Sequence, residues 1–461
     1  MGLVRSEKMK TFQDFEKAKN NKKEFIQSLI NEFKSSELYK NALTAQKYYK
    51  GENTEILQRL QWFYKGDGVR EQDKFKANNQ VPSEFFTKIV KQENSYLLGN
   101  GVTIEDDIKK DLGRKFDNKI FKAGNYALVD GVSWGYCYID KKGKFALDVW
   151  RGTEFVPLYD ERTGVLRAGV RFWQIDEDKP IYVELYEEDG RTEFSINNKD
   201  ITETSAKKAY RIKIAKDILS ERVIDEENWS TLPIVPLFGN DTHRSTLTVA
   251  LKNKIDLYDI IMSDFGNNLE DSVDVYWVIK NYGGQSLEEF LQDYKYYKSV
   301  KVGENGDASP QTIDVPYEAR KTALEILRQQ IYESSMSLDT SILSGGSLTN
   351  VAIKAMMADL ELKTDDFESC VLDFLDDILT LYSEYKGLTK EFEEPKLIRR
   401  TLINDTEVID NIIKMRSDID QETALKLNPY IQDEEIPEII KRIDEENMNK
   451  YSIEDENIIE E

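Results

Sequence analysis

The first residue to consider as a catalytic group is His243, the only histidine in the chain. It lies in the polar stretch GNDTHRST, just before a long helical segment. A histidine that acts as a general base needs a partner side chain and a pocket around it. Since the sequence points to neither, we interpret His243 as a surface or capping residue.

Carboxylates are the second group with possible chemistry. The pairs Asp365-Asp366 and Asp376-Asp377 could in principle hold Mg²⁺, as carboxylates do in nucleases. Both pairs fall within a helical segment, where adjacent residues diverge by about 100° and do not converge on one ion. We interpret them as a solvated helix face. A Mg²⁺-dependent nucleic-acid enzyme stays open as a rival hypothesis.

Other catalytic and cofactor motifs are missing. Cys137 and Cys370 lie far apart and, with one histidine, make neither a zinc site nor a disulfide framework. The chain has no P-loop, nucleophile elbow, dinucleotide fingerprint or EF-hand loop. Glycines occur close together at Gly66 and Gly68, at Gly283 and Gly284, and at Gly345 and Gly346, and we interpret these short stretches as turns. We therefore expect no enzyme activity, no metal and no cofactor.

The element that the chain is built around lies at 338–386. LDTSILSGGSLTN, residues 338–350, is interpreted as a mobile loop because Gly and Ser leave the backbone few steric limits. From Val351 to Lys386 there is no Pro or Gly, so one helix could extend about 54 Å at 1.5 Å per residue. Its apolar residues recur at helical spacing: Ile353, Met357, Leu360, Phe367, Val371, Phe374, Ile378 and Leu381.

Two further long helices are expected, in STLTVALKNKIDLYDIIMSDFGNNLED and YEARKTALEILRQQIYESSMS, on either side of a small α/β insert. The first has an apolar face made of Leu247, Leu251, Ile255, Tyr258, Met262, Phe265 and Leu269.

The rest of the chain mixes helices and strands. Residues 11–50 are expected to form helices, with Ser35 or Ser36 as a cap, and another helix begins near Pro82. Between about 125 and 240, beginning with YALVDGVSWGYCYID, apolar and polar residues alternate as in antiparallel strands. Beyond 400 short helices are expected, with Asn404 and Glu407 at capping-box spacing. The fold class is α+β and predominantly helical.

Charge, cysteine content and hydropathy exclude several classes of function. With 63 basic and 86 acidic residues the formal charge is −23, so the bulk surface does not bind a phosphate backbone. Two distant cysteines indicate a reducing compartment. There is no run of 18 apolar residues and no signal-peptide pattern at the N-terminus, so we expect a protein that is neither secreted nor membrane-spanning.

The order of elements resembles the portal proteins of tailed bacteriophages, of the type found in siphophages of Gram-positive hosts. The more specific parts are KIDLYDIIMSDFGNNLED, IYESSMSLDTSILSGGSLTNVAIKAMMADLELK and LNPYIQDEEIPEIIKRIDEE, in that order. The resemblance implies a fold with wing, stem, clip and crown, in which long helices line a channel in a ring oligomer.

The resemblance also implies a domain map. It gives N-terminal helices and an α/β wing at 1–244, a first stem helix at 245–271, a clip at 272–315, a second stem helix at 316–337, a tunnel loop at 338–350, a long wing helix at 351–398, and a crown with an acidic tail at 399–461.

The resemblance implies residue roles as well. The tunnel loop would face DNA through Leu343, Ser344, Gly345, Gly346, Ser347, Leu348, Thr349 and Asn350. Lys321 and Arg328 are candidates for lining the channel, or alternatively for salt bridges between subunits. The loop has no aromatic or charged residue beside its glycine pair that could act as a DNA sensor.

The implied function is a portal subunit in the virion, assembled in the host cytoplasm. It would form a ring, expected to hold twelve subunits, at one capsid vertex and be the conduit for DNA packaging and ejection. The implied partners are double-stranded DNA bound without sequence specificity, the terminase large subunit, a head-completion adaptor, and the major capsid and scaffolding proteins. A virion scaffold without a DNA channel is the alternative.

Overall fold

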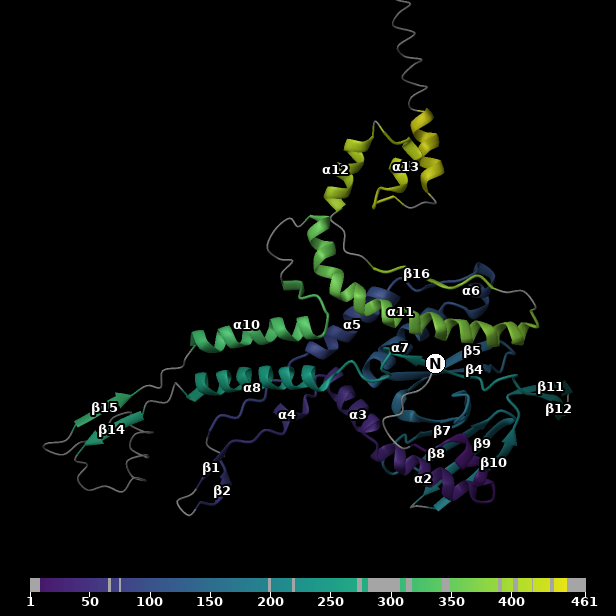
Figure 1. Ribbon diagram of the computed structural model, residues 1–461, viewed down its shortest axis with the longest axis horizontal. Helices are drawn as coiled ribbons and strands as arrows, with labels where there is room; N and C mark the ends of the chain where they lie inside the picture. Colours follow the sequence, from purple (N-terminus) through teal and green to yellow (C-terminus); the bar gives the residue numbers. More distant parts are fainter. Residues whose placement is uncertain are drawn as a thin grey trace, which may run out of the picture. The chain divides into compact units, whose positions relative to one another are not determined.

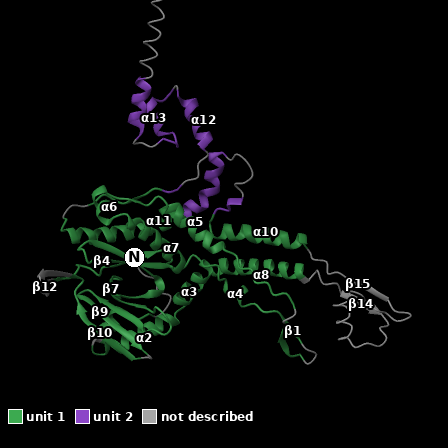
Figure 2. Cartoon of the chain, turned by 180° about the vertical axis from the view of Figure 1, so that it is seen from behind, with its two compact units in different colours: residues 1–337, 364–398 green, residues 338–363, 399–461 purple. Residues whose placement is uncertain are grey.

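The computed structural model describes residues 9–64, 68–73, 76–197, 200–217, 220–271, 276–280, 307–311, 317–341, 349–388, 392–400, 405–416, 418–431 and 435–445. The chain divides into two compact units (Figures 1 and 2). Unit 1 comprises residues 1–337 and 364–398, and unit 2 comprises residues 338–363 and 399–461.

Unit 1 begins with helices, as the periodicity of residues 11–50 predicts. Ser36 caps α3, where its hydroxyl accepts a hydrogen bond of 3.2 Å from the Tyr39 N–H. Gly51 follows this helix with a φ of 74°, a left-handed conformation that glycine adopts without strain. The helices up to residue 130 are α1 Phe12–Lys17, α2 Lys22–Ser35, α3 Glu37–Tyr49, α4 Thr54–Leu57, α5 Phe85–Leu98, α6 Asp106–Leu112 and α7 Lys115–Asp130.

One boundary predicted from sequence is wrong. The segment YALVD, residues 126–130, is the last turn of α7 and not the start of a strand. The helix buries Ile120, Ala123 and Ala127 at helical spacing, so its own apolar face decides the conformation. Gly131 then ends the helix with a φ of 92°, and β4 begins at Val132.

Two antiparallel sheets form the centre of unit 1. One has the strand order β13-β4-β5 and the other β10-β9-β8-β7-β6. Phe25, Leu29 and Phe33 of α2 cover one face of the five-stranded sheet. The bounds are β4 Val132–Ile139, β5 Phe145–Arg151, β6 Phe155–Tyr159, β7 Leu166–Trp173, β8 Ile181–Glu187, β9 Gly190–Asn197, β10 Asp200–Lys208 and β13 Ile234–Phe238.

The remaining strands form two-stranded ladders. They are β1 Trp62–Tyr64 with β2 Arg70–Gln72, β3 Val102–Thr103 with β16 Lys396–Leu397, β11 Arg211–Asp217 with β12 Ser220–Glu227, and β14 Tyr276–Lys280 with β15 Asp307–Gln311. The last ladder confirms the strand expected in DVYWVIK. The strand expected in KSVKV lies outside the described residues.

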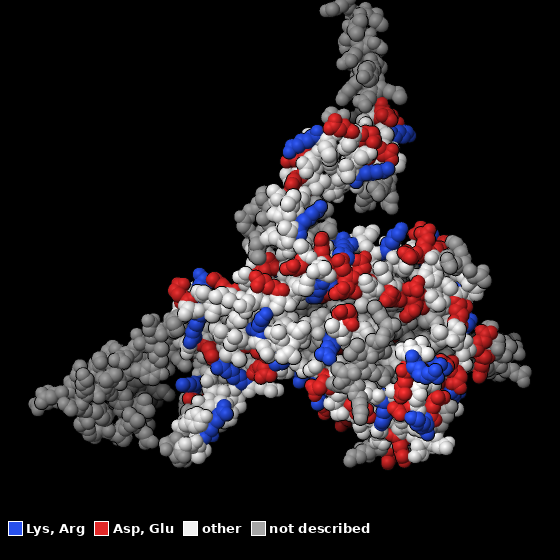
Figure 3. All heavy atoms as spheres, in the orientation of Figure 1, with Lys and Arg blue, Asp and Glu red and all other residues white. Residues whose placement is uncertain are grey.

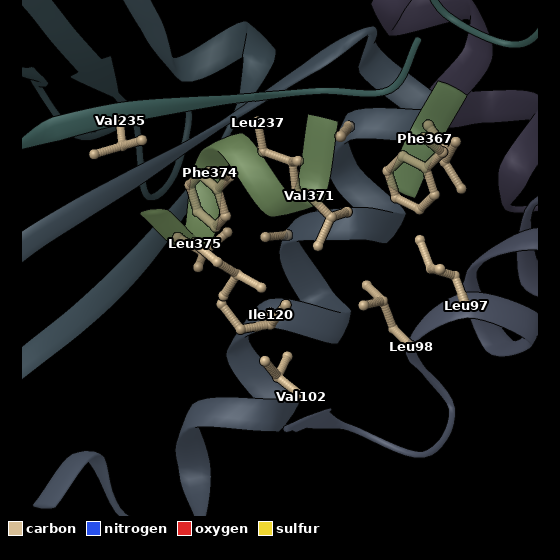
Figure 4. Packing of buried hydrophobic residues seen from close by; sticks show 14 of the residues in the cluster. Leu97, Leu98, Val102, Ile120, Val235, Leu237, Phe367, Val371, Phe374 and Leu375 are labelled. Carbon is tan, nitrogen blue, oxygen red and sulfur yellow. The ribbon is translucent and has the colours of Figure 1, made fainter. Parts of the chain in front are cut away.

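All three predicted long helices are present: α8 Val249–Asp271, α10 Tyr317–Ser334 and α11 Asn350–Lys386. All eight residues of the apolar face predicted for α11 are buried, which confirms that periodicity. From residue 364 onward α11 packs in the core of unit 1, where Phe367, Val371 and Phe374 point toward α5, α7 and the three-stranded sheet (Figure 4). A Cβ on Gly135 of β4 would lie 2.7 Å from the Phe374 ring, so this strand needs glycine to admit the helix.

Unit 2 contains the first turns of α11 together with α12 Asp405–Met415, α13 Gln421–Lys426 and a helical stretch at 436–445. Neither α12 nor α13 has a buried residue. Glu407 of α12 accepts a hydrogen bond of 2.6 Å from the Asn350 N–H. The other member of the predicted capping box, Asn404, lies outside the described residues.

The substitution Phe374→Ala should lower the free energy of unfolding of the chain by about 3–5 kcal/mol, because it removes a fully buried ring from the centre of the core. Urea denaturation followed by circular dichroism measures this change. The control Thr380→Ala, on the exposed side of the same helix, should change stability by less than about 0.5 kcal/mol. Equal effects from the two variants would contradict the packing of α11 on the sheet.

Candidate functional site

The helices α8 and α10 form a pair. Leu251 near the start of α8 and Ile331 near the end of α10 anchor one end of the pair in the core of unit 1. The rings of Phe265 and Tyr317 lie 5.9 Å apart, and Arg320 donates a hydrogen bond of 3.1 Å to the carbonyl of Asp264. At the other end Phe85 of α5 contacts both Tyr258, at 4.9 Å between ring centroids, and Tyr332, at 5.8 Å. These contacts fix the two helices relative to each other. Figure 1 shows them side by side.

From Asp256 onward the most buried side of α8 is polar, whereas the predicted apolar face is buried at Leu251 and Ile255. Asp256, Asp259, Ser263 and Asn267 are between 0% and 7% exposed, whereas Leu269 is 50% exposed. Their spacing of three and four residues places them on one side of the helix. Polar groups are buried at a large cost unless they are hydrogen-bonded, so this stripe implies partners.

The partners are backbone N–H groups of the extended segment 79–83. Asn267 accepts from Asn79 at 2.6 Å, Ser263 from Val81 at 3.0 Å, and Asp259 from Ser83 at 3.0 Å. Two residues of extended chain span about 6.6 Å and four residues of helix about 6.0 Å, so alternate N–H groups match every fourth helical side chain. We call this set of contacts the polar ladder.

Further bonds secure the region around the polar ladder. Arg59 makes a bidentate ion pair with Asp264, at 2.9 and 3.1 Å. Asn53 donates a second hydrogen bond to Asp259, and Tyr48 donates one to Asp256. Burial raises the pKa of Asp259, while the hydrogen bonds from Ser83 and Asn53 act in the opposite direction. The segment that carries the β1–β2 hairpin is thereby held on α8.

On another side of α8, three of the apolar residues predicted from sequence, Tyr258, Met262 and Phe265, line an open groove between α8 and α10. Its volume is about 220 Å³. Apolar walls are contributed by Tyr258, Met262, Phe265, Tyr317 and Leu324, and charged groups by Lys321, Glu325 and Arg328. The structure therefore brings Lys321 and Arg328, the two candidates for lining the channel, to one groove on α10. The guanidinium of Arg328 also lies 6.0 Å from the ring centroid of Tyr332.

The candidate loop residues are described only in part. Leu343, Ser344, Gly345, Gly346, Ser347 and Leu348 lie outside the described residues. Thr349 precedes α11, and its hydroxyl accepts a hydrogen bond of 3.3 Å from the Ala352 N–H. Asn350, predicted as the last loop residue, is the first residue of α11.

The residues considered for catalysis or metal binding lie apart from the groove. The ring of His243 stacks on Phe238 with 3.6 Å between centroids, and burial lowers its pKa. Both predicted acidic pairs are exposed, and acidic side chains gather over α11 on the face seen in Figure 3. Within the described parts of the chain, no group of three or more His, Cys, Asp or Glu residues could hold a metal ion, and no helix is long and apolar enough to cross a membrane.

Sequence reasoning missed the polar ladder. The signal was present as polar residues at positions 256, 259, 263 and 267, a helical stripe opposite the apolar one. Such a stripe usually faces solvent. Only the position of residues 79–83, far away in sequence, distinguishes a buried polar stripe from an exposed one.

Comparison with known proteins places the chain among phage structural components. It is 26% identical over 425 residues to the portal protein of Clostridium phage phiCD119, across 83% of this chain and 90% of that protein. It is 25% identical over 461 residues to the portal protein of Bacillus phage SPP1, across 93% of this chain and 86% of that protein. The model of the family described as phage portal protein, SPP1 Gp6-like, matches residues 30–449.

The chain belongs to this SPP1 Gp6-like family of phage portal proteins. Portal proteins are structural components of the virion that form ring oligomers at the capsid vertex. A chain from a solved structure titled neck of empty GTA particle computed with C6 symmetry is also similar, with 10% identity, 75% of this chain and 90% of that chain covered, and a TM-score of 0.42.

The substitution Asp259→Ala should leave the Ser83 N–H and the Asn53 side-chain amide without their acceptor, at a cost on the order of 1–3 kcal/mol. Native-state hydrogen exchange at the Ser83 amide should accelerate together with the loss of stability in urea. The control Asn253→Ala changes an exposed residue of the same helix and should leave both unchanged. An unaltered exchange rate at Ser83 in the Asp259 variant would show that the polar ladder does not hold this segment.

Proposed function

We propose that twelve copies of this chain form a ring at one capsid vertex and that DNA passes through the ring during packaging and ejection. The observation that carries the proposal is the family match over residues 30–449. The antiparallel helix pair supports it, since α8 and α10 are rigid elements of the kind that can surround a channel.

The domain map implied by the resemblance is part of this proposal. In it α8 and α10 are the two stem helices, residues 272–315 between them are the clip, α11 is the long wing helix, and residues 399–461 form the crown and acidic tail. The sheets and helices of 1–244 form the wing. The ends of α8 and α10 lie within four residues of the proposed boundaries, which supports this part of the map. The helix α11 begins one residue before the proposed wing helix but ends at Lys386, twelve residues before its proposed end at 398.

The charge of the chain suits a conduit that releases what it transports. Binding to a DNA backbone depends on Lys and Arg that neutralise phosphates. A ring of subunits that each carry a formal charge of −23 would retain DNA weakly and without sequence specificity. Lys321 and Arg328 are the candidates for weak contacts with DNA within the channel.

The other proposed partners follow from the same role. ATP hydrolysis belongs to a terminase, whose large subunit docks on the clip while DNA is packaged. A head-completion adaptor takes the same place afterwards, and the wing meets the major capsid and scaffolding proteins. The chain itself works without a cofactor and without catalysis, and assembles in the host cytoplasm.

Electron microscopy of the purified protein should show closed rings with a central hole wide enough for duplex DNA. Incubation of the same rings with Mg²⁺ and linear DNA should leave the DNA intact. Particles without a hole would favour a virion scaffold, and Mg²⁺-dependent cleavage by monomers would favour the nuclease hypothesis. Either result would contradict the portal role.

Replacement of both Gly345 and Gly346 by Pro should impair DNA packaging while rings still assemble, because Pro restricts φ to about −65° in a loop proposed to adjust to DNA. Packaged DNA protected from nuclease is the measurement, and ring formation is scored by microscopy. Replacement of both glycines by Ser, which keeps a wide backbone range, is the control and should package near the normal level. Normal packaging by the Pro variant would reject the adjustable-loop role.

A further inference from the structure

A second groove lies in unit 1 between α2 and the end of the five-stranded sheet, where β7 leads into β8 and where β9 ends. Its volume is about 600 Å³, within the roughly 300–1,000 Å³ of typical ligand sites. Figure 1 shows α2 beside these strands. None of the residues that line this groove belongs to the α8–α10 pair. We call it the α2 groove.

The floor of the α2 groove is aliphatic. Ile181 of β8 and Ile196 of β9 pair across the two strands, and both line the groove. Both are only partly buried, at the margin of the apolar cluster that joins α2 to the sheet. Ile30 of α2, which is 2% exposed, lines the same groove. A ligand with an aliphatic side chain would bury more of this apolar surface, which is favourable.

The walls of the α2 groove carry carboxamides. Gln27 and Asn31 belong to α2, Gln174 follows β7, and Asn197 is the last residue of β9. A carboxamide has both a hydrogen-bond donor and an acceptor, as each peptide group of a backbone does. Carboxamides on both sides of an aliphatic floor therefore suit an extended polypeptide chain.

The wall formed by the loop after β7 is held by its own hydrogen bonds. The side-chain amide of Gln174 donates to the carbonyl of Glu177 at 3.2 Å and to that of Lys179 at 2.9 Å. The Lys179 N–H donates to the carbonyl of Asp176 at 2.9 Å. This wall is thus formed before any ligand arrives, as in most binding sites.

A partly buried cation lies at one end of the α2 groove. Lys34 is seven residues after Gln27, about 10 Å further along the helix. Its ammonium lies 5.1 Å from the centroid of the Phe172 ring, and burial lowers its pKa. Among the described residues no carboxylate forms an ion pair with Lys34. An ammonium that is partly removed from water in this way is stabilised by an anionic ligand.

The other charges of the α2 groove limit which anion it accepts. Glu177, Asp178 and Lys179 also line it, so its charged side chains, with Lys34, sum to zero. A run of acidic residues would be repelled by the two carboxylates. A ligand with a single negative charge, located at the Lys34 end, suits the groove better.

We propose that the α2 groove binds the C-terminal end of another protein as an extended chain, with the terminal carboxylate at Lys34. The distance of about 10 Å from Gln27 to Lys34 corresponds to three extended residues at about 3.3 Å each. The carboxamides pair with the backbone, and the isoleucines contact an aliphatic side chain. A chain end has its single charge at one end, as the position of Lys34 requires. This site goes beyond the proposed ring and does not depend on it.

Fluorescence anisotropy with the purified full-length protein tests the site. The probe is the fluorescein-labelled peptide GSGSGALA with a free C-terminal carboxylate, compared with the same peptide ending in an amide. At low salt the free acid should bind at least tenfold more tightly, because only the acid carries the charge that Lys34 would pair with. Equal binding of the two forms, or binding of neither, would overturn the proposal while leaving the portal role intact.

Two variants separate the terminal charge from the backbone. Lys34→Gln should remove the difference between acid and amide, whereas Lys23→Gln, the same change of charge at an exposed lysine of the same helix, should keep it. Asn31→Ala, at another exposed position, should weaken both forms by a similar factor. Thermal midpoints check that each variant is folded. Loss of the difference in the Lys23 variant would mean attraction by overall charge and would overturn the site.

Other occupants of the α2 groove give different results. A variant that lacks residues 446–461 should bind the free acid as the full-length chain does. Tighter binding after this deletion would show that the chain's own end occupies the groove. Oligomers that dissociate when the free acid is added would show that a second copy occupies it. Either result would overturn the proposed partner.

Discussion

The burial of one side of α11 is the interaction on which the rest of unit 1 depends. Phe367, Val371 and Phe374 enter a single apolar cluster together with residues of α5, α7 and the three-stranded sheet. The same cluster includes Leu251 of α8 and Ile331 of α10. The inner ends of all three long helices therefore share one core, and the outer parts of α8 and α10 project from a fixed base.

Apolar packing and polar hydrogen bonding occur on different sides of α8. Apolar packing is non-directional and tolerates sliding, whereas the polar ladder pairs specific N–H groups with specific acceptors and so fixes the register of segment 79–83. Because polar residues hold this segment, Tyr258, Met262 and Phe265 of α8 are left to line the groove.

Incomplete burial in a single chain suits a protein that works in a ring. In addition to the open groove between α8 and α10, α12 in unit 2 has no buried residue, although apolar residues recur along it at helical spacing. Exposed apolar surfaces of this kind mark interaction sites in soluble proteins. Portal proteins form ring oligomers at the capsid vertex.

The sequence by itself determined the three long helices, the buried face of α11, most strands of the sheets and, through the order of elements, the family. Each of these depends on local periodicity or on motifs in a fixed order. Only the tertiary structure decided that a polar stripe of α8 is buried and that Lys321 and Arg328 share a groove with residues of α8. The physical reason is distance along the chain: Asp259 and Ser83 are 176 residues apart, and no local pattern indicates whether a polar side chain will meet water or a buried N–H group.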